Sequence, residues 1–184
     1  MMQPAIGLIE TNSIAKGIEA SDAMCKVSGV ELVDAYAICP GKYLVLITGM
    51  LADVQSSIDK GDEIAGHSLI DKFIIPNVHE QVVPAILGTN DIKMFESVGI
   101  IETFTVASCV RAADAAAKAA KIELIEIRLA KGLGGKSFVT LCSDDVGAVR
   151  SAVNTGCEII KDEGVIIERV IIPKAHDALK KTLV

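Results

Sequence analysis

The chain has 184 residues, of which 51% are hydrophobic, and its mean hydropathy is +0.46. Charges or glycines interrupt every apolar run before it reaches the roughly 18 residues that a membrane helix needs. Aromatic residues make up 3%, Trp is absent and the net charge is −6, which argues against a surface that stacks bases or neutralises a phosphate backbone.

The first predicted elements are a strand and a helix. Residues 5–11 form an apolar run of strand length, and Ile14, Ile18 and Cys25 then recur at helical spacing. This spacing predicts that the three side chains share the face of the helix that lies on the sheet. The first seven residues lack a basic segment and a long apolar segment, so no secretory signal is expected.

Two further strands are predicted, at residues 30–38 and 43–47, and a turn that begins with Cys39 joins them. Pro40 fixes its own φ and Gly41 tolerates a positive φ, so the turn should be tight. We therefore expect Cys39 to be presented at the tip of a hairpin rather than buried.

A second helix and a fourth strand complete this half of the chain. Leu51, Val54 and Ile58 have helical spacing, and the fourth strand ends at Ile75 because Pro76 stops it. A short helix is predicted after this strand.

The same order of elements returns in the second half of the chain, which indicates a tandem duplication. Four segments carry the match: residues 7–11 return as 99–103, 22–26 as 114–118, 30–32 as 122–124, and 74–79 as 171–176. The sequence therefore predicts two α+β domains, residues 1–90 and 95–184, joined by a linker near residues 88–97. Each domain should carry helices on a four-stranded antiparallel or mixed sheet.

The second copy has its own helical faces and its own loop between strands. Two sets of residues have helical spacing: Val106, Val110, Ala113, Ala117 and Ala120, and then Val146, Val149, Val153 and Ile160. The loop at residues 130–137 nearly spells a phosphate-binding P-loop, but Ala130 stands where glycine is required. A strand is predicted after this loop, whereas a P-loop must open a helix. These glycines are interpreted as turns.

The five cysteines are an odd number and include no Cys-x-x-Cys pair. A disulfide framework or a self-contained zinc site is therefore not expected, and a reducing cytoplasm is the natural setting. Four of them, Cys25, Cys109, Cys142 and Cys157, are interpreted as small core residues.

No constellation of base, nucleophile and oxyanion donor is visible, so no enzymatic activity is predicted. Glu10 and Glu102 recur through the duplication alone, and His79 and His176 are interpreted as capping or packing residues of the short helices.

Cys39 departs from the repeat, because Lys131 occupies the equivalent place in the second copy. A lone cysteine in a loop is usually only a thiol. In a three-fold ring, however, three copies of Cys39 would meet at the axis and form a site for a soft metal.

Several of these features together resemble the bacterial microcompartment (BMC) shell proteins. They are the Gly-x-Ile-Glu-Thr strand, the Asp-Ala-x-x-Lys helix, the glycine-rich loop and the Ile-Ile-Pro-x-x-His ending. Two copies in one chain resemble the tandem-domain class, whose trimers imitate the hexamers of single-domain members. The Ile-Cys-Pro-Gly-Lys loop is similar to that of a shell protein of propanediol utilisation, although the sequence does not fix which pathway is enclosed.

This resemblance implies a fold and an assembly. Each half would be a ferredoxin-like BMC domain with its helices on one face of the sheet, and a homotrimer would form a pseudohexamer that tiles into a shell facet. Lys26 and Lys118 would lie at the edges between trimers. The protein would be located in a microcompartment shell within the cytoplasm, with other BMC shell proteins as partners and no contact with nucleic acid or a membrane.

The resemblance also implies a redox pore. Two loops would line it: Ile38, Cys39, Pro40 and Gly41 in the first copy, and Lys131, Gly132, Leu133, Gly134 and Gly135 in the second. Cys39 from three chains would hold one [4Fe–4S] cluster, used for electron transfer or cluster relay with an encapsulated or cytosolic redox protein.

Two alternatives stay open. One is a metal-free shell pore that passes small metabolites. The other is a soluble regulatory oligomer that binds a small ligand between duplicated ferredoxin-like domains.

Overall fold

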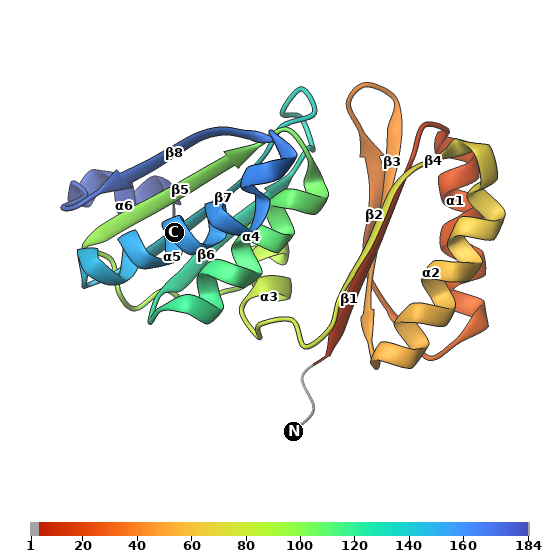
Figure 1. Cartoon of the computed structure of the whole chain (residues 1–184), viewed down its shortest axis with the longest axis horizontal. Helices are drawn as coiled ribbons and strands as arrows, with labels where there is room; N and C mark the ends of the chain where they lie inside the picture. Colours follow the sequence, from red (N-terminus) through yellow and green to blue (C-terminus); the bar gives the residue numbers. More distant parts are fainter. Residues whose placement is uncertain (1–3, 184) are drawn as a thin grey trace. The chain divides into compact units, whose positions relative to one another are not determined.

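A computed structural model describes residues 4–183, which belong to two compact units, one ending at Val78 and one beginning at His79 (Figure 1). Each unit contains a four-stranded antiparallel sheet with two long helices on one face, as the sequence predicts. Within the described residues, every helix is too short or too polar to cross a membrane.

The first unit follows the predicted order of elements. They are β1 (Ala5–Thr11), α1 (Ile14–Val27), β2 (Glu31–Ile38), β3 (Lys42–Gly49), α2 (Leu51–Ala65), a 3₁₀ turn (Gly66–Ser68) and β4 (Leu69–Ile75). The strand order in the sheet is β2-β3-β1-β4, so β2 and β4 are the edge strands.

The second unit repeats this module and adds a short helix before it and another after it. Its elements are α3 (Val82–Leu87), β5 (Ser97–Thr103), α4 (Val106–Ala119), β6 (Glu123–Leu129), β7 (Ser137–Ser143), α5 (Val146–Ile160), a 3₁₀ turn (Lys161–Glu163), β8 (Ile166–Ile172) and α6 (Asp177–Leu183). The strand order is β6-β7-β5-β8. The register of β1 with β4 shifts between Glu10 and Thr11, and the register of β5 with β8 shifts between Glu102 and Thr103. The two copies thus share the same irregularity in strand pairing.

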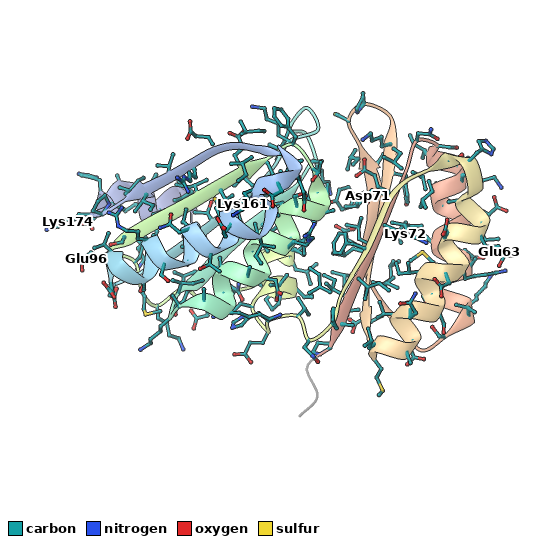
Figure 2. The ribbon with its side chains drawn as sticks, in the orientation of Figure 1. Glu63, Asp71, Lys72, Glu96, Lys161 and Lys174 are labelled. Atoms are coloured by element: carbon teal, nitrogen blue, oxygen red, sulfur yellow. The ribbon has the colours of Figure 1, made fainter. Side chains whose placement is uncertain are left out.

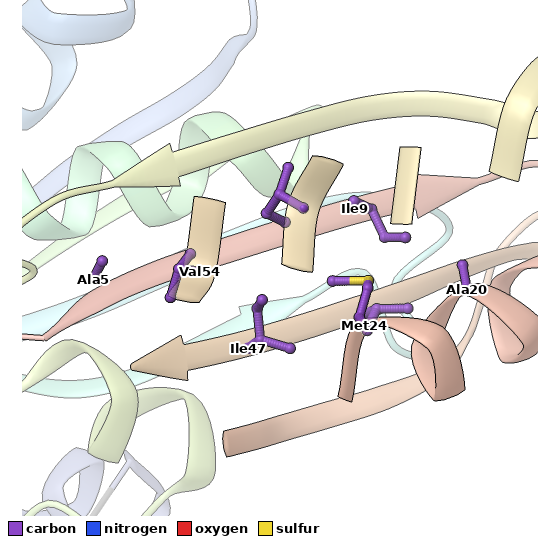
Figure 3. Packing of buried hydrophobic residues seen from close by; sticks show 8 residues of the cluster. Ala5, Ile9, Ala20, Met24, Ile47 and Val54 are labelled. Atoms are coloured by element: carbon purple, nitrogen blue, oxygen red, sulfur yellow. The ribbon is translucent and has the colours of Figure 1, made fainter. Parts of the chain in front are cut away.

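The core of the first unit lies between its sheet and its helices. Met24 of α1, Ile47 of β3 and Val54 of α2 pack there with Ile9 of β1 (Figure 3). Burial of one such aliphatic side chain contributes about 1.5–3 kcal/mol. Lys72 of β4, labelled in Figure 2, lies on the surface of the unit, where it pairs with Asp62 of α2.

The buried face of α1 differs from the predicted one. Ile14, Ile18 and Cys25 are exposed, and the helix instead buries Gly17 and Ala20, together with Ser21 and Met24. The physical reason is the close approach of α1 to β3: a Cβ atom on Gly17 would lie 2.6 Å from the side chain of Tyr43. Only small residues allow this approach, so the branched residues lie on the outer side of the helix.

The predicted faces of α4 and α5 are largely confirmed. Val106, Val110, Ala113 and Ala117 of α4 are buried, as are Val149, Val153 and Ile160 of α5, whereas Ala120 and Val146 are half-buried. The fourth strands end at Ile75 and Ile172, as predicted, and β2 begins at Glu31, one residue later than expected.

Candidate functional site

The hairpin between β2 and β3 presents Cys39 as the sequence predicts. The Gly41 N–H donates to the carbonyl oxygen of Ile38 over 3.0 Å, and Gly41 has a φ of 80°. The side chain of Ile38 is buried at the base of the turn, while Cys39, Pro40 and Gly41 are exposed. The Cys39–Pro40 peptide bond is cis, a feature that sequence reasoning did not find. The thiol therefore lies at the tip of an anchored turn.

An ion pair lies just after this turn, and its counterpart occurs in the second unit. Lys42 Nζ is 2.6 Å from Glu10 Oε1, and the Glu10 side chain is only 8% exposed. Lys136 Nζ is 3.2 Å from Glu102 Oε1. Each repeated glutamate thus has a lysine partner where the neighbouring strand begins: Lys42 is the first residue of β3, and Lys136 directly precedes β7. Each pair ties the end of its loop to β1 or β5.

The equivalent loop of the second unit connects β6 to β7 and is built from turns. Gly132, Gly134 and Gly135 have positive φ, as does Ala130 at 56°, and the Lys136 N–H donates to the carbonyl oxygen of Leu133 over 3.3 Å. Strand β7 follows at Ser137, so this loop leads into a strand and does not open a helix. The prediction that it is not a nucleotide-binding P-loop is consistent with this geometry.

Lys26 and Lys118 lie in the last turns of α1 and α4, at equivalent positions of the two units. Each pairs with the aspartate four residues earlier, Asp22 or Asp114, over 2.6 Å. Sequence reasoning quoted these aspartates but missed the pairing, although the i,i+4 spacing of opposite charges is its signal. The lysines are exposed, with Lys26 72% accessible at the side chain.

The remaining cysteines divide into buried and exposed. Cys109, Cys142 and Cys157 are buried, as expected, and burial raises the pKa of all three thiols, to about 12 for Cys109 and Cys142. Cys25 is exposed, which corrects its interpretation as a core residue. The cause is again the rotation of α1, which turns Gly17 and Ala20 toward the sheet.

Among residues 4–183, no three side chains of His, Cys, Asp or Glu gather into a metal-binding group. One chain therefore contributes a single exposed thiol at the hairpin tip, and a metal or cluster held there needs thiolates from other chains.

The two repeated histidines do cap the segments that follow them. His79 Nδ1 accepts from the Gln81 N–H over 3.3 Å, and His176 Nδ1 accepts from the Ala178 N–H over 3.1 Å. Both imidazoles thus hold the turn that leads into a short helix, as predicted.

Comparison with known proteins shows which family the chain resembles. The sequence matches the BMC domain family at residues 5–78 and 97–175. It is 40% identical to bacterial microcompartment shell protein PduT of Citrobacter freundii, with 100% of this chain and 99% of that protein covered. It is 26% identical to carboxysome assembly protein CcmO of Synechocystis sp., with 97% of this chain and 64% of that protein covered.

Two solved structures share the fold. A microcompartment protein from Desulfitobacterium hafniense superimposes with a TM-score of 0.94 at 50% identity, covering 97% of this chain and 99% of the other. The fused permuted hexameric shell protein MSM0275 superimposes with a TM-score of 0.61 at 18% identity, covering 86% and 84%. Since the family match takes in both sheets with their long helices, the chain belongs to the BMC domain family and carries two copies of that domain in tandem.

Proposed function

We propose that this protein is a structural component of a bacterial microcompartment shell. The observation that carries the proposal is the 40% identity to PduT over the whole length of both chains, since PduT is described as a shell protein. Both BMC domains are complete, with all four strands and both long helices in each. The repeated glutamates are engaged by lysines, which supports a structural rather than a catalytic role for them.

The proposed assembly is a homotrimer, in which three chains supply six BMC domains around one axis. The hairpin of Cys39 and the loop at residues 131–135 would then alternate around a central pore. Such trimers would tile with other BMC shell proteins, and the exposed Lys26 and Lys118 would lie at the edges.

We further propose that Cys39 from three chains holds a [4Fe–4S] cluster on this axis. The donor chemistry fits, because the thiol is exposed and lies at the tip of a fixed turn. Among residues 4–183 it belongs to no group of three potential ligands, so further thiolates would come from other chains. Three thiolates leave one iron for a small exogenous ligand. The bound cluster would supply one-electron transfer, or cluster relay, between the two sides of the shell and a redox protein partner.

The experiment is anaerobic purification followed by visible absorbance and by iron and sulfide analysis. A brown protein with roughly four iron atoms per three chains is expected. Cys39→Ser should remove the iron and leave the sedimentation of the protein unchanged. Cys25→Ser, which changes the other exposed thiol, is the matched control and should keep the full iron content.

The metal-free pore is the second candidate, and the same exposed position of Cys39 is compatible with it. Full iron content in Cys39→Ser, or none in the unaltered protein, would refute the cluster and leave this candidate. Electron microscopy of concentrated protein tests the shell role itself, because sheets or tubes are expected and discrete particles alone would favour a soluble regulator.

A further inference from the structure

The loop that carries Cys39 is short, and the residues on both sides of it are held in place. Ile38 and Lys42 are the last paired residues of β2 and β3, so the loop between these strands consists of residues 39–41. Ile38 is 5% exposed and anchors the loop on one side. On the other side, Lys42 is held by its ion pair with Glu10.

This ion pair continues the contact between β3 and β1 past the end of their backbone ladder. Thr11 and Tyr43 are the last paired residues of these two strands, so Lys42 lies one residue beyond them. Lys42 Nζ is 2.6 Å from Glu10 Oε1, and the Glu10 side chain is only 8% exposed. A carboxylate so little exposed to water is costly without its partner. The pair is therefore a firm tie between the end of the Cys39 loop and β1.

The duplicate of this pair has a different relation to its loop. Leu129 and Ser137 are the last paired residues of β6 and β7, so Lys136 lies within the loop and does not close it. The distance from Lys136 Nζ to Glu102 Oε1 is 3.2 Å, and the Glu102 side chain is 32% exposed. This second loop contains no cysteine. Of the two ion pairs, the tighter one thus holds the closing residue of the hairpin that presents the exposed thiol.

A cluster shared between chains would place a strict demand on the position of this thiol. Three copies of Cys39 would have to reach one group together, and a mobile loop would lose conformational freedom each time the site formed. Residues that orient metal ligands without binding the metal typically contribute about 10–100-fold in metal affinity. A tie that fixes the loop before the cluster binds would reduce the entropy lost on binding.

We propose that Glu10 and Lys42 are positioning residues for Cys39: their ion pair fixes the end of the hairpin so that three thiols can converge on the cluster. Neither side chain is a ligand, and the pair acts through the backbone of residues 39–41. This inference rests on the proposed cluster and deepens it, because it names residues outside the ligand set on which retention of the iron depends.

A nitroxide label on Cys39 measures the mobility of the hairpin tip in protein that contains no cluster. The label is attached in the Cys25→Ser background, because Cys25 is the other exposed thiol. Only a small fraction of the chains is labelled, so that labels within one oligomer do not interact. Glu10→Gln and Lys42→Met should each increase the mobility of the label in its EPR spectrum. Glu102→Gln, which breaks the duplicate pair, is the matched control and should leave the spectrum unchanged.

The two variants separate an effect of position from an effect of charge. Glu10→Gln leaves the ammonium of Lys42 unpaired, whereas Lys42→Met leaves the carboxylate of Glu10 unpaired. An effect of charge on the hairpin tip would therefore have opposite signs in the two variants, but positioning predicts the same direction in both. The double variant should be no more mobile than either single variant, since each change already breaks the pair. Lys42→Arg keeps a cationic partner for Glu10 and should retain the spectrum of the unaltered protein.

The rate of iron loss measures the consequence for the cluster. Each protein is purified anaerobically and mixed with bathophenanthroline disulfonate, which absorbs visible light when it binds ferrous iron. Glu10→Gln and Lys42→Met should lose iron about 10–100-fold faster than the unaltered protein. Lys42→Arg and Glu102→Gln should lose it at the rate of the unaltered protein, and sedimentation should be the same for all of them.

The two measurements distinguish failure of this inference from failure of the proposed cluster. Unchanged label mobility in both Glu10→Gln and Lys42→Met overturns the positioning, and so do changes of opposite sign. A more mobile label with unchanged iron loss also overturns it, because the cluster is then indifferent to the pair. An unaltered protein that binds no iron overturns the cluster itself, and the label spectra still decide whether the pair fixes the hairpin.

Discussion

Three of the five cysteines are buried and two are exposed, and this difference in environment sets their chemistry. Burial raises the pKa of the Cys109 thiol from 9.0 to about 12. For Cys142 the pKa is also raised to about 12, first by burial and then by the negative charge of Glu123. Since the thiolate is the nucleophile and the metal ligand, these two cysteines are inert near neutral pH, and the exposed Cys39 is available for ligand chemistry.

These raised pKa values predict that the protein loses stability in alkali. Above about pH 9, the thiols of Cys109 and Cys142 ionise in the unfolded chain but keep their protons in the folded one until about pH 12. Their contribution is fully present below pH 9 and is lost as the pH rises toward 12, because the folded state then binds more protons. The pKa of Tyr36 is also raised by burial, which acts in the same direction. The free energy of unfolding should therefore fall across this range in denaturation at a series of pH values.

Two alanine variants assign this slope to the buried thiols. Cys109→Ala should flatten the decline, because it removes one of the groups that ionise only on unfolding. Cys25→Ala, at an exposed thiol, should leave the slope unchanged. Equal slopes in both variants would contradict the assignment.

The two long helices of each unit cross at an equivalent glycine, but its neighbours differ. A Cβ atom on Gly156 of α5 would lie 2.8 Å from the backbone carbonyl oxygen of Ala112 in α4. A Cβ atom on Gly61 of α2 would instead lie 2.6 Å from the Sδ atom of Met24 in α1. In the second unit, the backbone of α5 at Gly156 therefore lies directly against the backbone of the alanine-rich α4. In the first unit, the flexible thioether of Met24 lies between the two helices.

This difference predicts opposite tolerance to the same substitution. Gly156→Ala should lower the free energy of unfolding by about 1–3 kcal/mol, because a backbone oxygen cannot move away without shifting the helix. Gly61→Ala should change it by less than about 1 kcal/mol, since Met24 can adopt another rotamer and alanine favours the helix. Urea denaturation of the two variants provides the measurement, and a larger loss for Gly61→Ala would exclude this account of the packing.

Hydrophobic periodicity predicted the order of elements and turn residues predicted both loops between strands, because strands and turns are encoded locally. Recurring segments predicted the duplication. Periodicity alone was not sufficient everywhere. It failed for the buried face of α1, where Ile14 and Ile18 form a regular stripe that the structure leaves exposed. The stripe carried no information on how closely α1 approaches Tyr43. At the site, the position of Cys39 was readable, whereas the Lys42–Glu10 pair depends on strand register, which the sequence alone did not supply.

The boundary of the sequence repeat and the boundary of the compact units lie in different places. The repeat assigns His79 and α3 to the first copy, but the compact second unit begins at His79. The cause is the set of contacts that α3 and the residues after it make with β6, including Asn90 Nδ2 to the Leu124 carbonyl oxygen at 2.7 Å. The first repeat thus gives its tail, His79 and α3, to the second unit.

This exchange predicts that a residue of the first repeat stabilises the second unit. Gln81→Ala removes one hydrogen bond to Leu124 of β6 and one to Ile122 just before this strand, and it leaves the Leu124 N–H without its acceptor. A loss of about 1–3 kcal/mol is expected, the usual cost of an unsatisfied buried donor. Hydrogen exchange resolved along the full chain should show faster exchange in β6 and α4, while β1 and β4 of the first unit keep their protection. Glu80→Ala, at the neighbouring exposed position, is the control and should change neither unit by more than about 0.5 kcal/mol. Faster exchange confined to β1 and β4 would show that the tail belongs energetically to its own repeat.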